Sequence, residues 1–81
     1  MSASSLLKID FEEESRASAL FASIVPEVKH TKPGIAKVSI SKEGGAILLK
    51  IEASSVAALR AILNSYIRWL STSLEVMELG D

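Results

Sequence analysis

One long segment dominates the chain, because the residues from Val56 to about Met77 contain neither glycine nor proline. Ser54 and Ser55 precede it, and serine is a favoured N-cap residue. As an α-helix the segment would span ~33 Å. At ~100° per residue its apolar side chains fill an arc of ~160°: Val56, Leu59, Ile62, Leu63, Tyr66, Ile67, Trp69, Leu70 and Leu74. A helix on a small sheet needs only about 100° of apolar surface, so this helix carries an excess.

The residues before this helix predict a small sheet and one shorter helix. Apolar and polar residues alternate at 7–11, 36–41 and 46–53, which is typical of half-buried strands. Gly44 and Gly45 lie between the last two strands and supply the positive φ of a tight hairpin. The predicted fold class is α+β, a three-stranded antiparallel sheet with two helices on one face in the order β-α-β-β-α.

The shorter helix lies between the first two strands. Ser15 is a suitable N-cap, and apolar residues recur at helical spacing from Ala17 to Val28. Pro26 lacks an amide hydrogen and disfavours helical geometry at the preceding residue. We therefore expect this helix to end near Pro26. Residues 1–81 are expected to form a single domain, with residues 1–5 frayed.

Composition limits the classes of function. The 81 residues are 48% apolar and carry nine Lys/Arg against ten Asp/Glu, which argues against a disordered chain and against a whole-surface nucleic-acid binder. The absence of cysteine excludes disulfide frameworks, thiolate zinc sites and thiol nucleophiles. No apolar run approaches the ~18 residues of a membrane span. We expect a cytoplasmic domain without membrane contact.

The excess apolar surface of the long helix predicts contact with another chain. Three strands and one short helix cannot cover the whole arc, and large exposed apolar patches usually mark interfaces. The alternative is a wide core face with Trp69 at the sheet edge. The residues predicted at a protein interface are Ile62, Tyr66, Trp69, Leu70, Ser73 and Val76. Acidic residues, Glu75 among them, also gather at the negative end of the helix dipole, so either this end frays or a partner supplies basic groups.

The same helix carries a family likeness. The run from Leu59 to Leu70, LRAILNSYIRWL, resembles the signature helix of the Pcc family, the small subunits of the KEOPS/EKC complex that makes threonylcarbamoyladenosine in tRNA. The likeness extends over roughly Leu6 to Leu79. It implies a homodimerising scaffold subunit that binds the catalytic, ATPase-fold transferase subunit through apolar helix surfaces and helps to hold tRNA.

Catalytic chemistry finds little support in the sequence. The one histidine, His30, lies in a predicted loop without an acidic neighbour, and no serine lies in a G-x-S-x-G context. The carboxylates of Glu12, Glu13 and Glu14 are expected to be a solvated helix entry rather than a metal or acid–base site. We therefore predict no catalytic residue, no metal site and no cofactor.

Two polar groups are candidates for contact with tRNA. Arg60, Asn64 and Arg68 recur every four residues on one side of the long helix. Lys29, Lys32 and Lys37 concentrate positive charge before the hairpin. Phosphate contact and ordinary surface or interhelical roles both remain open for these residues. The alternative function is a stand-alone RNA-binding module that uses this basic patch; a small enzyme is a third possibility, for which the sequence names no residues.

Overall fold

Five elements follow one another along the chain: β1 (Ala3–Asp10), α1 (Glu14–His30), β2 (Ala36–Glu43), β3 (Ala46–Ala53) and α2 (Val56–Leu79). This computed structural model describes residues 3–30, 34 and 36–79. The element order confirms the predicted β-α-β-β-α arrangement. Ser55 caps α2 as expected, because its hydroxyl accepts a hydrogen bond from the Ala58 amide at 3.1 Å.

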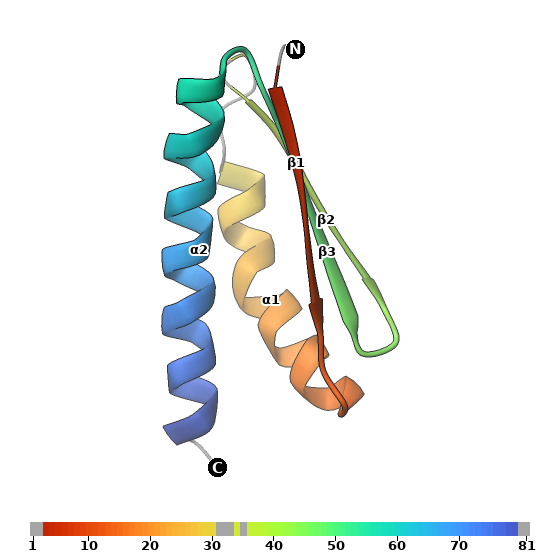
Figure 1. Ribbon diagram of the computed structural model, residues 1–81. Coiled ribbons are helices and arrows are strands. Elements are labelled where there is room, and N and C mark those ends of the chain that lie inside the picture. The colour runs from red at the N-terminus through yellow and green to blue at the C-terminus, as the bar shows by residue number, and fades with distance from the viewer. Residues whose placement is uncertain (1–2, 31–33, 35, 80–81) are drawn as a thin grey trace.

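The sheet is antiparallel throughout and has the strand order β1-β3-β2. Its register aligns Leu7 of β1 and Ile40 of β2 with Leu49 of the central strand. Both helices cover the same face of the sheet, and the opposite face carries no helix (Figure 1). The side chains of β3 that alternate toward the helices are the buried ones, as the period-two pattern predicted.

The core lies between β3 and the two helices. Its buried members are Ala17, Leu20 and Ile24 of α1, Ile47, Leu49 and Ile51 of β3, and Tyr66 and Leu70 of α2. No polar side chain is buried among the described residues. Helix α2 therefore contacts the core through the middle of its apolar arc, at Tyr66 and Leu70.

Helix α1 is longer than predicted, because it continues through Pro26 to His30. Pro26 removes the amide that would bond the carbonyl of Ala22, but both residues are exposed, so water can satisfy that carbonyl. The turn beyond Pro26 is held by tertiary contacts. Val28 packs against the core, and the Tyr66 hydroxyl donates to the Glu27 carbonyl oxygen at 3.3 Å. Glu27 belongs to the last turn, where carbonyls lack helical partners.

Strand β1 also departs from the prediction, because it begins at Ala3 rather than Leu7. Residues Ala3–Ser5, which we expected to be frayed, pair with residues 51–53 of β3. The sequence did not predict this part of the strand because Ala3, Ser4 and Ser5 show no apolar alternation. They form a strand because β3 is long enough to pair with them.

The hairpin between β2 and β3 turns at Gly44 and Gly45. Only Gly44 has the positive φ that the sequence predicted for both, at 57°. Gly45 is required for a different reason. The backbone of Phe11 runs against it, with the Phe11 amide donating to the Gly45 carbonyl oxygen at 2.8 Å, and a β-carbon at Gly45 would overlap the Phe11 carbonyl oxygen.

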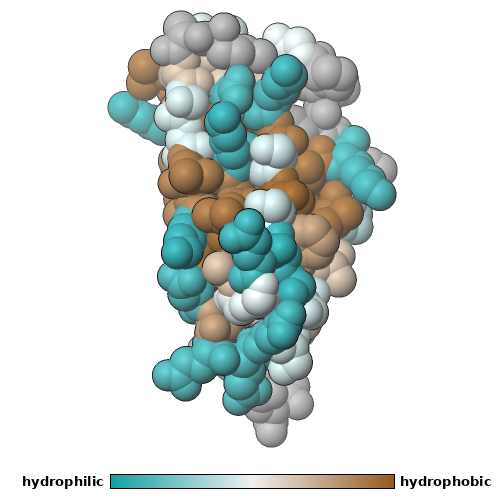
Figure 2. Space-filling view, turned by 90° about the vertical axis from the view of Figure 1, so that its right-hand side faces the viewer, coloured by the Kyte–Doolittle hydropathy of each residue, from teal (hydrophilic) through white to brown (hydrophobic). Residues whose placement is uncertain are grey.

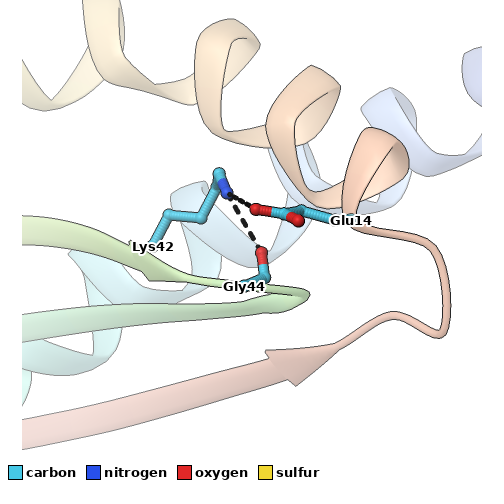
Figure 3. A network of polar contacts seen from close by, with 3 residues as sticks. All are labelled: Glu14, Lys42 and Gly44. Carbon is cyan, nitrogen blue, oxygen red and sulfur yellow. Dashed lines mark hydrogen bonds and ion pairs between the residues drawn. The ribbon is translucent and has the colours of Figure 1, made fainter.

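A polar contact beside this turn joins the sheet to the start of α1. The Lys42 ammonium donates to Glu14 Oε1 at 3.1 Å and to the Gly44 carbonyl oxygen at 3.0 Å (Figure 3). The Lys42 side chain is 23% exposed, so this ion pair is more sheltered than a free surface pair. It fixes the hairpin tip against the first turn of the helix.

Replacing Lys42 by methionine is expected to lower the free energy of unfolding by about 1 kcal/mol, since both bonds are lost while the apolar stem is kept. Chemical denaturation measures the change. Lys50→Met is the matched control, because Lys50 pairs with Glu52 at 3.2 Å on the open face of the sheet and is expected to change stability by less than about 0.5 kcal/mol. Equal effects of the two substitutions would contradict this role for Lys42.

Candidate protein-interaction surfaces on helix α2

Helix α2 exposes apolar side chains along two separate flanks. Trp69 and Val76 are 39% and 63% exposed, and Val56 and Ile67 are 62% and 43% exposed. Trp69 and Val76 point within ~20° of each other around the helix axis, as do Val56 and Ile67, but the two pairs lie ~160° apart. We call Ile62, Trp69, Ser73 and Val76 the groove flank. The outer flank comprises Val56, Leu63, Ile67 and Leu74.

The groove flank borders a pocket between the two helices. The pocket has a volume of about 210 Å³, and its lining residues are Ala19 and Ser23 of α1 with Thr72, Ser73, Val76 and Met77 of α2. Ser23 Oγ donates to the Leu20 carbonyl oxygen at 2.9 Å and lies 3.4 Å from Ser73 Oγ. The hydroxyls are thus held by the chain itself, and small side chains on both helices leave room for an apolar group of a partner.

The outer flank lies on the opposite side of α2. Helix α1 packs against β2 and β3, whereas α2 packs against β3 and β1, so the side of α2 that faces away from α1 is the side of the β1 edge. Leu63 and Leu74 are partly buried against the core. Val56 and Ile67 lie on the same side of the helix and are exposed to solvent. Among the residues that the structure describes, strand β1 pairs only with β3 and is an edge of the three-stranded sheet.

The predicted interface residues divide into three groups. Trp69 and Val76 are exposed, and Ile62 and Ser73 are half-buried. Tyr66 is 1% exposed and Leu70 is also buried, so their assignment as surface residues is wrong: both belong to the core of the chain. The Tyr66 ring contacts the Trp69 indole edge to face, with 5.0 Å between the ring centroids. Contact of the other four with a partner stays a prediction.

The face of the sheet without helices is mainly polar. Figure 2 looks onto this side of the molecule and displays hydrophilic side chains around an apolar band across its middle. Leu6 is exposed there, next to the ion pairs Lys8–Asp10 at 3.9 Å and Lys50–Glu52 at 3.2 Å. Its charges are therefore largely paired within the strands, in contrast to the apolar flanks of α2.

Two kinds of feature are absent from the described residues, a cluster of metal-ligating side chains and a membrane-spanning helix. Histidine, cysteine and acidic side chains nowhere gather in threes in a way that could hold a metal ion, within residues 3–30, 34 and 36–79. In the same part of the chain neither helix is long and apolar enough to cross a membrane.

Comparison with known proteins agrees with this picture. The model of the family described as "Transcription factor Pcc1" matches residues 5–78. The chain belongs to the Pcc1 family. It is 32% identical over 71 residues to the KEOPS complex subunit Pcc1 of Pyrococcus abyssi (strain GE5 / Orsay), a match that covers 88% of this chain and 87% of that relative.

A solved structure of the Pcc1 family has the same fold. A chain from the crystal structure of a binary Gon7–Pcc1 complex superposes with a TM-score of 0.87 and 26% identity, over 99% of this chain and 98% of that chain. The resemblance of residues 59–70 to the signature helix of the family is thereby confirmed, and the solved structure places a chain of this fold in a complex with a partner protein.

The polar side of α2 and the lysines near the end of α1 are the surfaces that the sequence predicted to contact tRNA. Arg60, Asn64 and Arg68 are all exposed. Lys29 and Lys37 are exposed as well, close to the end of α1 and the start of β2, and Lys32 lies outside the described residues. The end of α1, the start of β2 and the start of α2 lie in the same half of the molecule (Figure 1). Their predicted contact with tRNA stays a prediction.

Proposed function

We propose that the chain is a cytoplasmic, non-catalytic scaffold subunit of a KEOPS/EKC-type complex. It forms a homodimer, binds the catalytic, ATPase-fold transferase subunit and supports the threonylcarbamoyladenosine modification of tRNA. One observation carries the proposal: α2 keeps two apolar flanks exposed although the core is complete without them. The Pyrococcus abyssi relative, which is a KEOPS complex subunit, supports the choice of complex.

The groove flank suits the transferase subunit. A groove between two helices accepts an amphipathic helix of a partner, whose apolar side chains enter at helical spacing. Here the pocket beside Ser73 and Val76 receives such a side chain, and the Trp69 indole supplies the large aromatic surface that is enriched in interface hot spots. Trp69 is held in place by its contact with the buried Tyr66 ring.

A second surface is needed because the proposed subunit holds two partners at once. The outer flank of α2 and the edge of β1 are on the other side of the helix and do not overlap the groove. An exposed strand edge and an exposed apolar helix flank both favour association. The homodimer can therefore form without displacing the transferase subunit.

Val76→Asp is expected to weaken capture of the transferase subunit at least about 30-fold, since a charge replaces an apolar contact in the pocket beside the groove flank. Tagged transferase subunit is used to co-purify the chain, and the dissociation constant is measured with the purified pair. Val56→Asp is the matched control, because Val56 is equally exposed but lies on the outer flank. It is expected to leave capture unchanged, and equal loss in both variants would contradict the assignment of the groove.

The second candidate function is the stand-alone RNA-binding module, which the exposure of Arg60, Asn64, Arg68, Lys29 and Lys37 favours. Such a module binds tRNA without a partner, and its affinity falls with salt in proportion to the number of phosphate contacts. A scaffold subunit co-purifies with the transferase subunit, whereas an independent module does not. The same pull-down thus separates the two functions.

A further inference from the structure

Strand β2 is the second edge of the sheet. In the part of the chain that the structure describes it pairs only with β3, so alternate amide and carbonyl groups along its outer side have no strand beside them. Helix α1 packs against β2, and the side chains of Val38 and Ile40 pack against the core from this strand. The strand is therefore held extended, and an open extended edge is a template for pairing with another chain.

The charges of β2 are arranged symmetrically about its middle. Lys37 and Glu43 each lie three residues from Ile40, and the period of two places both on the face without helices. Both are exposed, and neither makes an ion pair with another described residue. Two copies of β2, paired antiparallel about Ile40, would bring each Lys37 opposite the partner's Glu43. Opposite charges in that position stabilise a strand pair, so this edge is complementary to itself.

Lys42 opposes such pairing from the other face of the strand. It is one of the β2 side chains that alternate toward the helices, and its neighbour across the register is Ile47, which is buried. Its ammonium reaches Glu14 in the first turn of α1 (Figure 3), and 23% of the side chain remains exposed. A strand paired about Ile40 would place the partner's Val38 beside Lys42 and remove water from this ion pair, which is unfavourable.

The edge at β1 differs from the edge at β2 in this respect. The residues of β1 on the helix side of the sheet are all uncharged: Ala3, Ser5, Leu7 and Ile9. Its two charged residues, Lys8 and Asp10, are exposed on the face without helices. A charged residue that points inward is one of the ways in which native edge strands avoid pairing. Of the two edges, only β2 has one.

We propose that Lys42 keeps the β2 edge unpaired, and that without it two copies of the chain pair antiparallel through β2 about Ile40. Lys42 is then the residue that limits assembly, because copies that paired at both sheet edges would join without end. The inference goes beyond the proposed function and rests on the proposed homodimer only for the mass of the unmodified chain. It also gives the ion pair with Glu14 a role besides stability.

Lys42→Val tests the proposal, since it removes the inward charge and supplies a β-branched side chain that suits a strand. We expect light scattering to give at least about twice the mass of the unmodified chain. Amide hydrogen exchange should slow at least about tenfold at the β2 amides that point away from β3, because these gain carbonyl partners. A mass equal to that of the unmodified chain, or a larger mass without this protection of β2, would overturn the proposal.

Two variants separate the inward charge from its side effects. Glu14→Gln breaks the same ion pair but leaves the Lys42 ammonium in place, so we expect it to keep the mass of the unmodified chain. Lys50→Val makes the same replacement on the central strand, where no edge is open, and should also leave the mass unchanged. Association of Glu14→Gln as strong as that of Lys42→Val would mean that lost stability is the cause, and would contradict the proposal.

Charge reversal in the Lys42→Val chain tests the register. Adding Lys37→Glu should raise the dissociation constant of the new contact about tenfold, because it creates like-charge pairs at both ends of the paired strands. Adding Glu43→Lys as well should restore association, and no effect of either change would contradict pairing about Ile40. A monomeric unmodified chain would contradict the proposed homodimer, whereas a mass unchanged by Lys42→Val contradicts only the role of Lys42 at the β2 edge.

Discussion

Replacing Tyr66 by alanine is expected to lower the free energy of unfolding by about 3–5 kcal/mol. The Tyr66 ring is fully buried at the centre of the core, and its removal leaves a cavity among residues from both helices and β3. The substitution also removes the hydroxyl that bonds the last turn of α1 at Glu27. A domain of this size has a total stability of the same order, so the variant is expected to be largely unfolded at 25 °C.

Circular dichroism and chemical denaturation measure this change, and two variants divide its causes. Tyr66→Phe keeps the ring and removes only the hydroxyl, at an expected cost of no more than about 1 kcal/mol. Trp69→Ala removes a larger but partly exposed side chain, at an expected cost of about 1–2 kcal/mol, while weakening assembly more strongly. A Trp69→Ala variant less stable than Tyr66→Ala would show that the indole, not the phenol, is the core residue.

The fold was predictable to the level of element order because local patterns and tertiary structure agree over most of the chain. The alternation at 46–53 predicts a half-buried strand, and the helical spacing after Val56 predicts a helix with one apolar side. The prediction failed where tertiary contacts outweigh local preference. Proline interrupts a helix in isolation, but the bond from Tyr66 and the packing of Val28 hold the turn after Pro26. Neither contact can be read from residues 14–30 alone.

The candidate site was predictable in part for a related reason. The width of the apolar arc indicates that α2 carries more apolar surface than a small sheet covers, and the exposure of Trp69 and Val76 confirms the excess. A helical arc does not say where on it the sheet lies. The sheet and α1 cover the middle of the arc, at Tyr66 and Leu70, and leave both rims exposed. The rim with Val56 and Ile67 was therefore missed, although both residues are in the arc.

Substitution of a hairpin glycine is also expected to destabilise the fold strongly. Gly45→Ala is expected to lower the free energy of unfolding by about 3 kcal/mol, at the upper end of the range for overpacking. The new methyl group would overlap the Phe11 carbonyl oxygen, and a backbone atom cannot move aside as a flexible side chain can. The chain must therefore separate the hairpin tip from the end of β1, which breaks the bond from the Phe11 amide to Gly45.

Gly44→Ala is the matched control. A glycine with positive φ is usually expected to be the more sensitive member of a turn, whereas here we expect Gly45 to be the more sensitive one. Gly44 has the positive φ, at 57°, so alanine there is strained by about 1–2 kcal/mol, but a β-carbon at Gly44 meets no atom within 4 Å. Chemical denaturation of both variants should rank Gly45→Ala as the less stable, although its own φ is unremarkable. The reverse ranking would mean that the turn is limited by backbone conformation alone and that β1 and the hairpin tip can separate without loss. The ranking therefore tests whether the close approach of Phe11, which lies between β1 and α1, holds the end of β1 against the hairpin tip.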